Sequence, residues 1–203
     1  MGFYLIEELE QGSSEWHAWR RGVIGASDAS TIMGENRFKS RSYLIKEKLG
    51  QVREFQGNAK TREGQNLEGV ARDDLAKKFS LKLKPIVAQD AQVPYLAASI
   101  DAICSDHKEV FEIKAGLKTY EHTLASQNVP GYYLAQLQHI LMVTKKESMI
   151  FAAYRPGQNL ITVRIPRDEK YISRLRELEV SFVNDLVHRG HEVQFQFRGR
   201  LVG

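Results

Sequence analysis

Two acids and a lysine fall within one short stretch of the chain, SIDAICSDHKEVFEIK, at residues 99–114. The stretch reads as two strands joined by a tight turn. In the second strand, Phe111 and Ile113 point to one side, and Glu112 and Lys114 point to the other. The apolar pair can therefore enter a core while the acid and the ammonium group share a cleft.

The length of the turn decides which side chains face each other. If residues 105–108 form a four-residue turn, Asp101 lies directly opposite Glu112. Cross-strand neighbours on one face have Cβ atoms about 4.5–5.5 Å apart, and two carboxylates that close repel unless one is protonated or a cation lies between them. Because Mg²⁺ is bound by one or two carboxylates with water and phosphate oxygens, the hairpin predicts a metal site that Lys114 also contacts. On spacing alone, an ordinary surface hairpin is the alternative.

Length and composition indicate one soluble domain spanning residues 1–203, with 42% hydrophobic and 27% charged residues. No apolar run is long enough to span a membrane, and the acidic N-terminus does not resemble a signal peptide. The single cysteine, Cys104, excludes an internal disulfide and a cysteine-based zinc cage. The expected location is therefore the cytoplasm. The formal net charge of +4 is a mild bias toward polyanionic partners.

The order of the expected elements is helices, then a mixed sheet, then helices packed on it, which is typical of an α/β or α+β domain with one core. Helices are expected at residues 15–20, from Ser27, at 40–50, at 60–79, from about Tyr120, at 131–143 and at 167–188. Strands are expected at residues 81–88, in the hairpin, at 148–154 and at 159–165. The tail at residues 191–203 is expected to pack on a neighbouring subunit or on its own core.

Four blocks of the sequence resemble the phage lambda exonuclease family, the YqaJ-type viral recombinases of the PD-(D/E)XK nuclease superfamily. In chain order they are EWHAWRRGVIGASDASTIMG, EGQNLEGVARDDL, SIDAI with FEIK, and YYLAQLQHILMVT. Asp101, Glu112 and Lys114 match the D…ExK core, with Ile100 in place of the usual proline. The resemblance implies a restriction-endonuclease-like fold, in which helices flank a mixed central β-sheet.

The resemblance also implies hydrolysis of a DNA phosphodiester with Mg²⁺, or alternatively Mn²⁺, as cofactor. One or two ions would be held by Asp101, Glu112, Glu68 and the main-chain carbonyl of Ile113. On spacing alone, Glu68 could instead pair with Arg72 one helical turn further on. Glu63, earlier in the same helix, competes with Glu68 for the metal site.

Two further residues complete the implied reaction centre. Lys114 would orient the attacking water and help to deprotonate it, and Gln136 would assist in placing it. Gln136 and Gln138 lie on opposite flanks of the apolar stripe of helix 131–143, so they cannot share one task. Gln138 is expected to be a plain helix-flank residue, and His139 a solvated or packing residue.

An anion site is expected where a helix begins after the segment IGAS. Ser27 and the unpaired N–H groups of the first turn would bind the anion, and Arg20 could clamp it; a capping serine and a surface arginine are the alternative. The resemblance implies that this pocket holds the 5′-phosphate of the strand being cut, with Ser99 adding a hydroxyl and Trp16 near the DNA path. Tyr120 stands where lambda exonuclease has an additional phosphate-binding arginine, which weakens the expected 5′-phosphate requirement.

The implied activity is processive 5′-to-3′ digestion of linear double-stranded DNA in a bacterial host cell. The product would be a 3′ single-stranded overhang for a phage annealing protein, which uses it in homologous recombination. The resemblance implies a ring-shaped homotrimer. The alternatives are a restriction-type or structure-specific endonuclease, which would cut closed circular DNA, and a non-catalytic DNA-end-binding module. The complete D…ExK series argues against the last.

Overall fold

The computed structural model describes residues 2–52, 59–193 and 196–202, apart from the side chains of residues 59–62 and 65. The helices are α1 Ser14–Arg21, α2 Ala29–Ile32, α3 Arg41–Lys48, α4 Ala59–Phe79, α5 Leu117–Ser126, α6 Leu134–Thr144 and α7 Glu169–His188, with 3₁₀ turns η1 Ala26–Asp28 and η2 Gly131–Tyr133. The strands are β1 Phe3–Ile6, β2 Ile24–Gly25, β3 Leu83–Asp90, β4 Leu96–Cys104, β5 Val110–Ala115, β6 Ser148–Tyr154, β7 Ile161–Pro166 and β8 Arg200–Val202.

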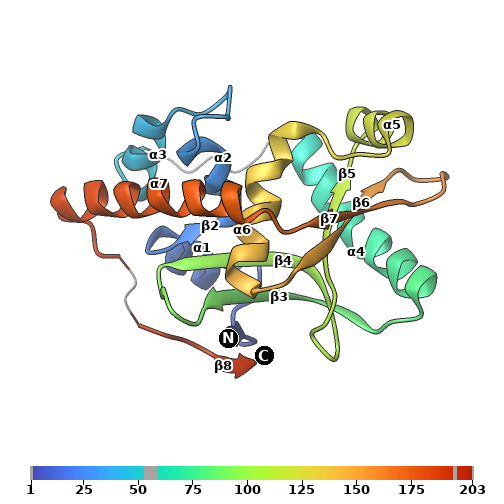
Figure 1. Ribbon diagram of the computed structural model, residues 1–203, viewed down its shortest axis with the longest axis horizontal. Helices are drawn as coiled ribbons and strands as arrows, with labels where there is room; N and C mark the ends of the chain where they lie inside the picture. Colours follow the sequence, from blue (N-terminus) through green and yellow to red (C-terminus); the bar gives the residue numbers. More distant parts are fainter. Residues whose placement is uncertain (1, 53–58, 194–195, 203) are drawn as a thin grey trace.

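The strands form a mixed sheet in the order β7-β6-β5-β4-β3-β1-β8, with β2 paired to β4. Figure 1 shows α6 and α7 crossing one face of this sheet, while α4 lies on the other. On the α4 face, Leu75 packs with Phe111 and Ile113 in a buried cluster, so these two strand residues enter the core as their alternation predicts. Glu112 and Lys114 are left on the opposite side. The predicted mixed sheet flanked by helices is confirmed.

The register of the β4–β5 hairpin is the one that a four-residue turn predicts. Ala102 pairs with Phe111 and Ile103 pairs with Val110, so the next position along, Asp101, lies opposite Glu112. The ladder between the two strands extends no further than Ala102 in the pairs that the structure gives. The strands therefore begin to separate at the two acids.

A β-bulge lies at the same place on the other side of β4. Lys84 pairs with Ile103 but Ile86 pairs with Ile100, so Asp101 and Ala102 together face a single residue, Pro85. Proline has no N–H to contribute to a ladder and is tolerated at bulges. Bulges re-aim side chains and are frequent beside active sites.

Several elements differ from the sequence expectations. Strands β1, β2 and β8 were not expected; β8 pairs with β1, so the described part of the tail packs on its own sheet. Helix α2 has only four residues, and α5 begins at Leu117, three residues before the expected start. Among the described residues, no helix is long and apolar enough to cross a membrane.

His139 is fully buried, so the expectation of a solvated residue is wrong and that of a packing residue is confirmed. Its Nδ1 lies 2.6 Å from Glu179 Oε1 and its Nε2 lies 2.9 Å from the carbonyl oxygen of Ala97. Both partners are acceptors, so both ring nitrogens donate and the imidazole is a cation. Burial opposes this charge, but Glu179 outweighs it and the pKa of His139 is raised. The pair joins α6 to α7 and to β4.

Replacing this cation should destabilise the fold in a pH-dependent way. Breaking a buried ion pair from one side costs about 3–5 kcal/mol, which is the loss of unfolding free energy that we expect for His139→Gln at pH 6. Because the folded-state pKa of His139 is raised, its contribution is present below the unfolded-state pKa of about 6.5 and is lost as the pH rises through the folded-state pKa. Urea unfolding of both chains between pH 6 and 10 measures this. The difference between them should shrink as the pH rises; a constant difference would contradict a charged His139.

Candidate active site

Asp101 is held by its side chain and by its main chain where β4 and β5 separate. The Asp101 Oδ2 atom accepts a hydrogen bond from the N–H of Ile113 at 2.8 Å, so a carboxylate takes the place of a strand partner. From α4, Arg72 Nε donates to the carbonyl oxygen of Asp101 at 2.7 Å. Arg72 thus binds strand β4 directly, and this contact competes with the alternative pairing of Arg72 with Glu68.

Glu112 is the most enclosed of the three acids. It is 1% exposed, and its Oε1 accepts hydrogen bonds from Lys114 Nζ and from Gln136 Nε2, each at 2.5 Å. Its Oε2 is buried and has no hydrogen-bond partner among the described residues. The structure therefore brings together Glu112, Lys114 and Gln136 as expected, and leaves one carboxylate oxygen able to accept another ligand.

The three acids Asp101, Glu112 and Glu68 outnumber the cations beside them, and the pKa values of all three are raised. Burial and the charge of Asp101 raise the pKa of Glu112 to about 8 and that of Glu68 to about 7. Burial also raises the pKa of Asp101. Burial opposes the charge on Lys114, but Glu112 and Asp101 outweigh it and raise its pKa. Lys114 and Arg72 together do not compensate the three neighbouring carboxyl groups.

These residues fit a hard divalent cation. All the candidate donors are oxygens, which Mg²⁺ prefers, and the unpartnered Oε2 of Glu112 is one of them. Among the residues that the structure describes, no three His, Cys, Asp or Glu side chains lie close enough together to form a metal cage. The arrangement therefore fits an ion held by one or two carboxylates, with the remaining ligands supplied by water, substrate phosphate and main chain.

The structure distinguishes Glu68 from Glu63, and Gln136 from Gln138, by where each side chain lies. Glu68 is half-buried and lies close enough to Asp101 and Lys114 for their charges to act on it, whereas Glu63 is exposed. Gln138 is buried and is not a plain flank residue. Its amide donates to the carbonyl of Pro166 and accepts from the N–H of Asp168, both at 2.9 Å, which ties α6 to the start of α7.

The four residues expected at the anion site also lie together. Arg20 Nη2 donates to Ser27 Oγ at 2.6 Å, and the Arg20 guanidinium lies 4.9 Å from the centre of the Trp16 ring. Trp16 Nε1 donates to Ser99 Oγ at 2.9 Å. Because Ser99 precedes Asp101 by two positions on β4, this group of polar residues adjoins the acids.

The physical basis of the anion site differs from the expectation. Ser27 lies in η1, and the helix that follows is only four residues long and has no side-chain cap, so a helix dipole adds little. Asp28 accepts instead from the N–H of Gly25 at 3.1 Å, and its carboxylate lies 2.8 Å from Lys48 and 4.0 Å from Arg20. Burial would raise the pKa of Asp28, but these two cations hold it at about 2.

Asp28 and Lys48 were not singled out as site residues from the sequence. Lys48 lies at the end of a separate helix, and nothing local in the sequence indicates its contact with Asp28. Tyr133 was not singled out either. Its ring centre lies 5.5 Å from Lys114 Nζ, a contact that depends on how η2 packs beside β5.

A family model for the YqaJ-like viral recombinase domain matches residues 15–147, which include every site residue described above. The chain belongs to this family. The Bacillus subtilis (strain 168) protein YqaJ is 28% identical over 198 residues, a match that covers 92% of this chain and 60% of that protein. The chain therefore spans about three-fifths of the length of this YqaJ relative.

Two solved structures share the fold of this YqaJ-family chain. The alkaline exonuclease LHK-Exo from Laribacter hongkongensis matches with a TM-score of 0.76 at 22% identity, over 87% of this chain and 94% of that one. A phage related exonuclease from Haemophilus somnus 129PT matches with a TM-score of 0.57 at 16% identity, over 83% of this chain and 96% of that one.

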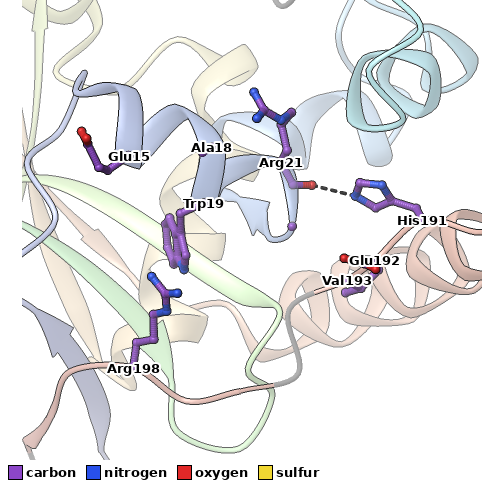
Figure 2. A pocket seen from close by; sticks show the side chains of 9 residues that line it. Glu15, Ala18, Trp19, Arg21, His191, Glu192, Val193 and Arg198 are labelled. Carbon is purple, nitrogen blue, oxygen red and sulfur yellow. Dashed lines mark hydrogen bonds between the residues drawn. The ribbon is translucent and has the colours of Figure 1, made fainter.

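A cavity of about 640 Å³ lies along a different side of α1 from the anion site of this YqaJ-family chain. Figure 2 shows Trp19, Arg21 and His191 lining it, with His191 Nε2 bonded to the carbonyl oxygen of Arg21 at 2.9 Å. None of the acids around Asp101 lines this cavity. Arg21 follows Arg20 on the same helix but lines this cavity and makes no contact with Ser27 in the described structure, so it can serve as a control for Arg20.

A divalent cation should stabilise this YqaJ-family chain through Glu112. In metal-free buffer, the folded state keeps a proton on Glu112 that the unfolded chain releases above its ordinary pKa of 4.5. Unfolding free energy should therefore fall as the pH rises from 4.5 toward the folded-state pKa of about 8. At pH 8, Mg²⁺ should raise the thermal midpoint of the wild type far more than it raises that of Glu112→Gln. Without metal, the thermal midpoint of Glu112→Gln should be higher than that of the wild type. Equal Mg²⁺ shifts in both chains would contradict the site.

Proposed function

We propose that this member of the YqaJ family is a DNA exonuclease that digests linear double-stranded DNA from 5′ to 3′ and leaves a 3′ single-stranded overhang. One observation carries the proposal: the buried carboxylate of Glu112, opposite Asp101, is held by Lys114 and Gln136, and one of its oxygens has no partner in the part of the chain that the structure describes. Both solved proteins that share the fold are exonucleases, which supports the reaction class.

In the proposed reaction, Asp101 and Glu112, with Glu68 and the main-chain carbonyl of Ile113, would hold one or two Mg²⁺ ions. When bound, the metal lowers the pKa of a coordinated water and stabilises the charge that builds on the phosphate. Mn²⁺ has the same ligand preference and would serve in its place.

The remaining residues place the reactants. Lys114 would orient the attacking water by donating a hydrogen bond to it, since its ammonium group already lies against the acid that would hold the metal. Its raised pKa keeps this group protonated, so Lys114 positions the water and does not take its proton. Gln136 fixes the rotamer of Glu112 by donating to the same oxygen. Gln136 therefore acts through Glu112 and is a positioning residue in the described structure.

The DNA end is proposed to bind beside these residues. Arg20, Ser27 and Ser99 would hold the terminal 5′-phosphate, with Trp16 linking the two halves of the pocket through its ring and its N–H. The buried Tyr120 donates its hydroxyl to the carbonyl oxygen of Asn159, so no cation occupies the position of the additional arginine. The 5′-phosphate preference would therefore depend on Arg20.

The cellular setting belongs to the same proposal. The overhang would be passed to a single-strand annealing protein of the same phage-type recombination system, in the cytoplasm of a bacterial host. A homotrimer that encircles the DNA would account for processive digestion, because an enclosed duplex does not leave between successive cleavages.

Digestion of end-labelled DNA tests the proposed function directly. With Mg²⁺, linear duplex DNA should release mononucleotides from the 5′ end, fastest from a 5′-phosphate, while a closed circle stays intact. Cutting of the circle would indicate an endonuclease on the same core. Binding of DNA ends without any release of nucleotides would indicate a non-catalytic module.

Removing the lysine should separate chemistry from binding. One positioned hydrogen-bond donor at the reacting groups contributes about 10²–10³-fold to rate, so Lys114→Ala should slow cleavage by at least about a hundredfold while DNA-end binding persists. Lys108→Ala is the matched control, because Lys108 lies in the same hairpin with its side chain 81% exposed. Near-wild-type cleavage by Lys114→Ala would show that the site is assigned wrongly.

Two adjacent arginines test the end pocket. A charge-assisted hydrogen bond contributes about 1.5–3 kcal/mol, so Arg20→Ala should reduce the preference for 5′-phosphate over 5′-hydroxyl ends roughly tenfold or more. Arg21→Ala should leave the preference unchanged, since Arg21 lines the separate cavity shown in Figure 2. The ratio of initial digestion rates on the two ends is the measurement. Equal effects of both substitutions would rule out a specific role for Arg20.

A further inference from the structure

A pair of tyrosines extends from the catalytic lysine to the molecular surface. The inner one, Tyr133, has its ring centre 5.5 Å from Lys114 Nζ, within the range of a cation–π contact. Its hydroxyl lies 3.3 Å from Thr119 Oγ1, and its ring centre lies 5.7 Å from that of Phe151. Contacts on three sides hold this half-buried ring in place.

The outer ring, Tyr132, is held on one side only by contacts that the structure describes. Its centre lies 4.5 Å from that of Tyr133 at an interplanar angle of 55°, and 56% of the residue is exposed. An aromatic ring buries a large apolar surface when it is covered, so an exposed ring beside a reaction centre has a surface available for a planar ligand. The rigid Tyr133 supports it from beneath.

We propose that Tyr132 is a base-stacking residue, which packs against a nucleobase of the DNA end next to the scissile phosphate. This inference depends on the proposed function, because it names how that same site holds its substrate. Lys114, Tyr133 and Tyr132 are in consecutive contact, so a phosphate at the lysine brings the base of an adjoining nucleotide to the outer ring. Stacking on an aromatic ring tolerates any sequence, since every base has a π-face. That tolerance suits an enzyme that digests DNA without regard to sequence.

An exposed leucine on α5 supplies a control of matched exposure. Leu124 on α5 is 54% exposed, close to the exposure of Tyr132, but it is aliphatic and has no ring to stack. If exposed apolar surface alone mattered, Leu124→Ala and Tyr132→Ala would have similar effects. If stacking matters, Tyr132→Ala lowers kcat/KM on DNA and Leu124→Ala does not. Tyr132→Trp keeps an aromatic ring and should therefore keep kcat/KM near the wild-type value.

The test compares kcat/KM for wild type and variants on 5′-phosphorylated duplexes that carry either normal nucleotides or one abasic nucleotide at each of the first positions from the end. Stacking contributes about 1–3 kcal/mol per base, so Tyr132→Ala should lower kcat/KM roughly five- to hundredfold on normal DNA. At one position, the abasic nucleotide should lower the wild-type value by a similar factor and leave Tyr132→Ala almost unaffected. Tyr132→Trp and Leu124→Ala should stay within about twofold of wild type on normal DNA.

The outcomes separate the two proposals. A wild-type chain that releases no nucleotides from any duplex overturns the proposed function. A fully active wild type with an equally active Tyr132→Ala overturns the stacking inference alone. A Tyr132→Ala loss that is the same on normal DNA and at every abasic position also overturns it, because the ring would then act on something other than a base.

Discussion

Repulsion between the facing carboxyl groups of Asp101 and Glu112 is the constraint on which the rest of the site depends. The hairpin register places them opposite each other, and burial removes the water that would weaken their interaction. Lys114 and Gln136 both donate to one oxygen of Glu112, and Arg72 holds the main chain of Asp101. These contacts fix the geometry but leave excess negative charge, which is the condition under which a divalent cation is attracted.

Strand β4 connects the two halves of the site. Its side chains alternate regularly up to Ile100, which packs in the core on the α6 face, but Ala102 packs in the cluster on the α4 face. In a regular strand these two residues would share one face, so the bulge opposite Pro85 changes the phase of the strand at Asp101. Ser99 on one side of this change contacts Trp16 of α1, and Asp101 contacts β5. Because of the bulge, one strand carries both Ser99 of the proposed DNA-end pocket and Asp101 of the acidic site.

The sequence was sufficient where the determining contacts are local. Turn length predicted the register of Asp101 and Glu112. Helix periodicity separated Gln136 from Gln138, and the family resemblance assigned the site to Gln136. The sequence was insufficient where partners come from distant segments: the short η1–α2 turn is stabilised by Lys48 instead of a helix dipole, and β8 pairs with β1 from the other end of the chain. No spacing rule reveals that His139 meets Glu179, because that pair depends on how α7 lies across α6.

The sequence separations of these contacts bear on the order in which the site forms. Glu112 and Gln136 are 24 positions apart, whereas Trp16 and Ser99 are 83 apart. Closing the longer loop costs more entropy before any contact repays it. The hairpin and the crossover to β6 can therefore assemble as one local folding unit, while the end pocket closes only when α1 docks. Segments with few buried apolar contacts open first, and none of the residues of α1 is buried. We therefore expect partial unfolding to abolish recognition of DNA ends before it separates the acids.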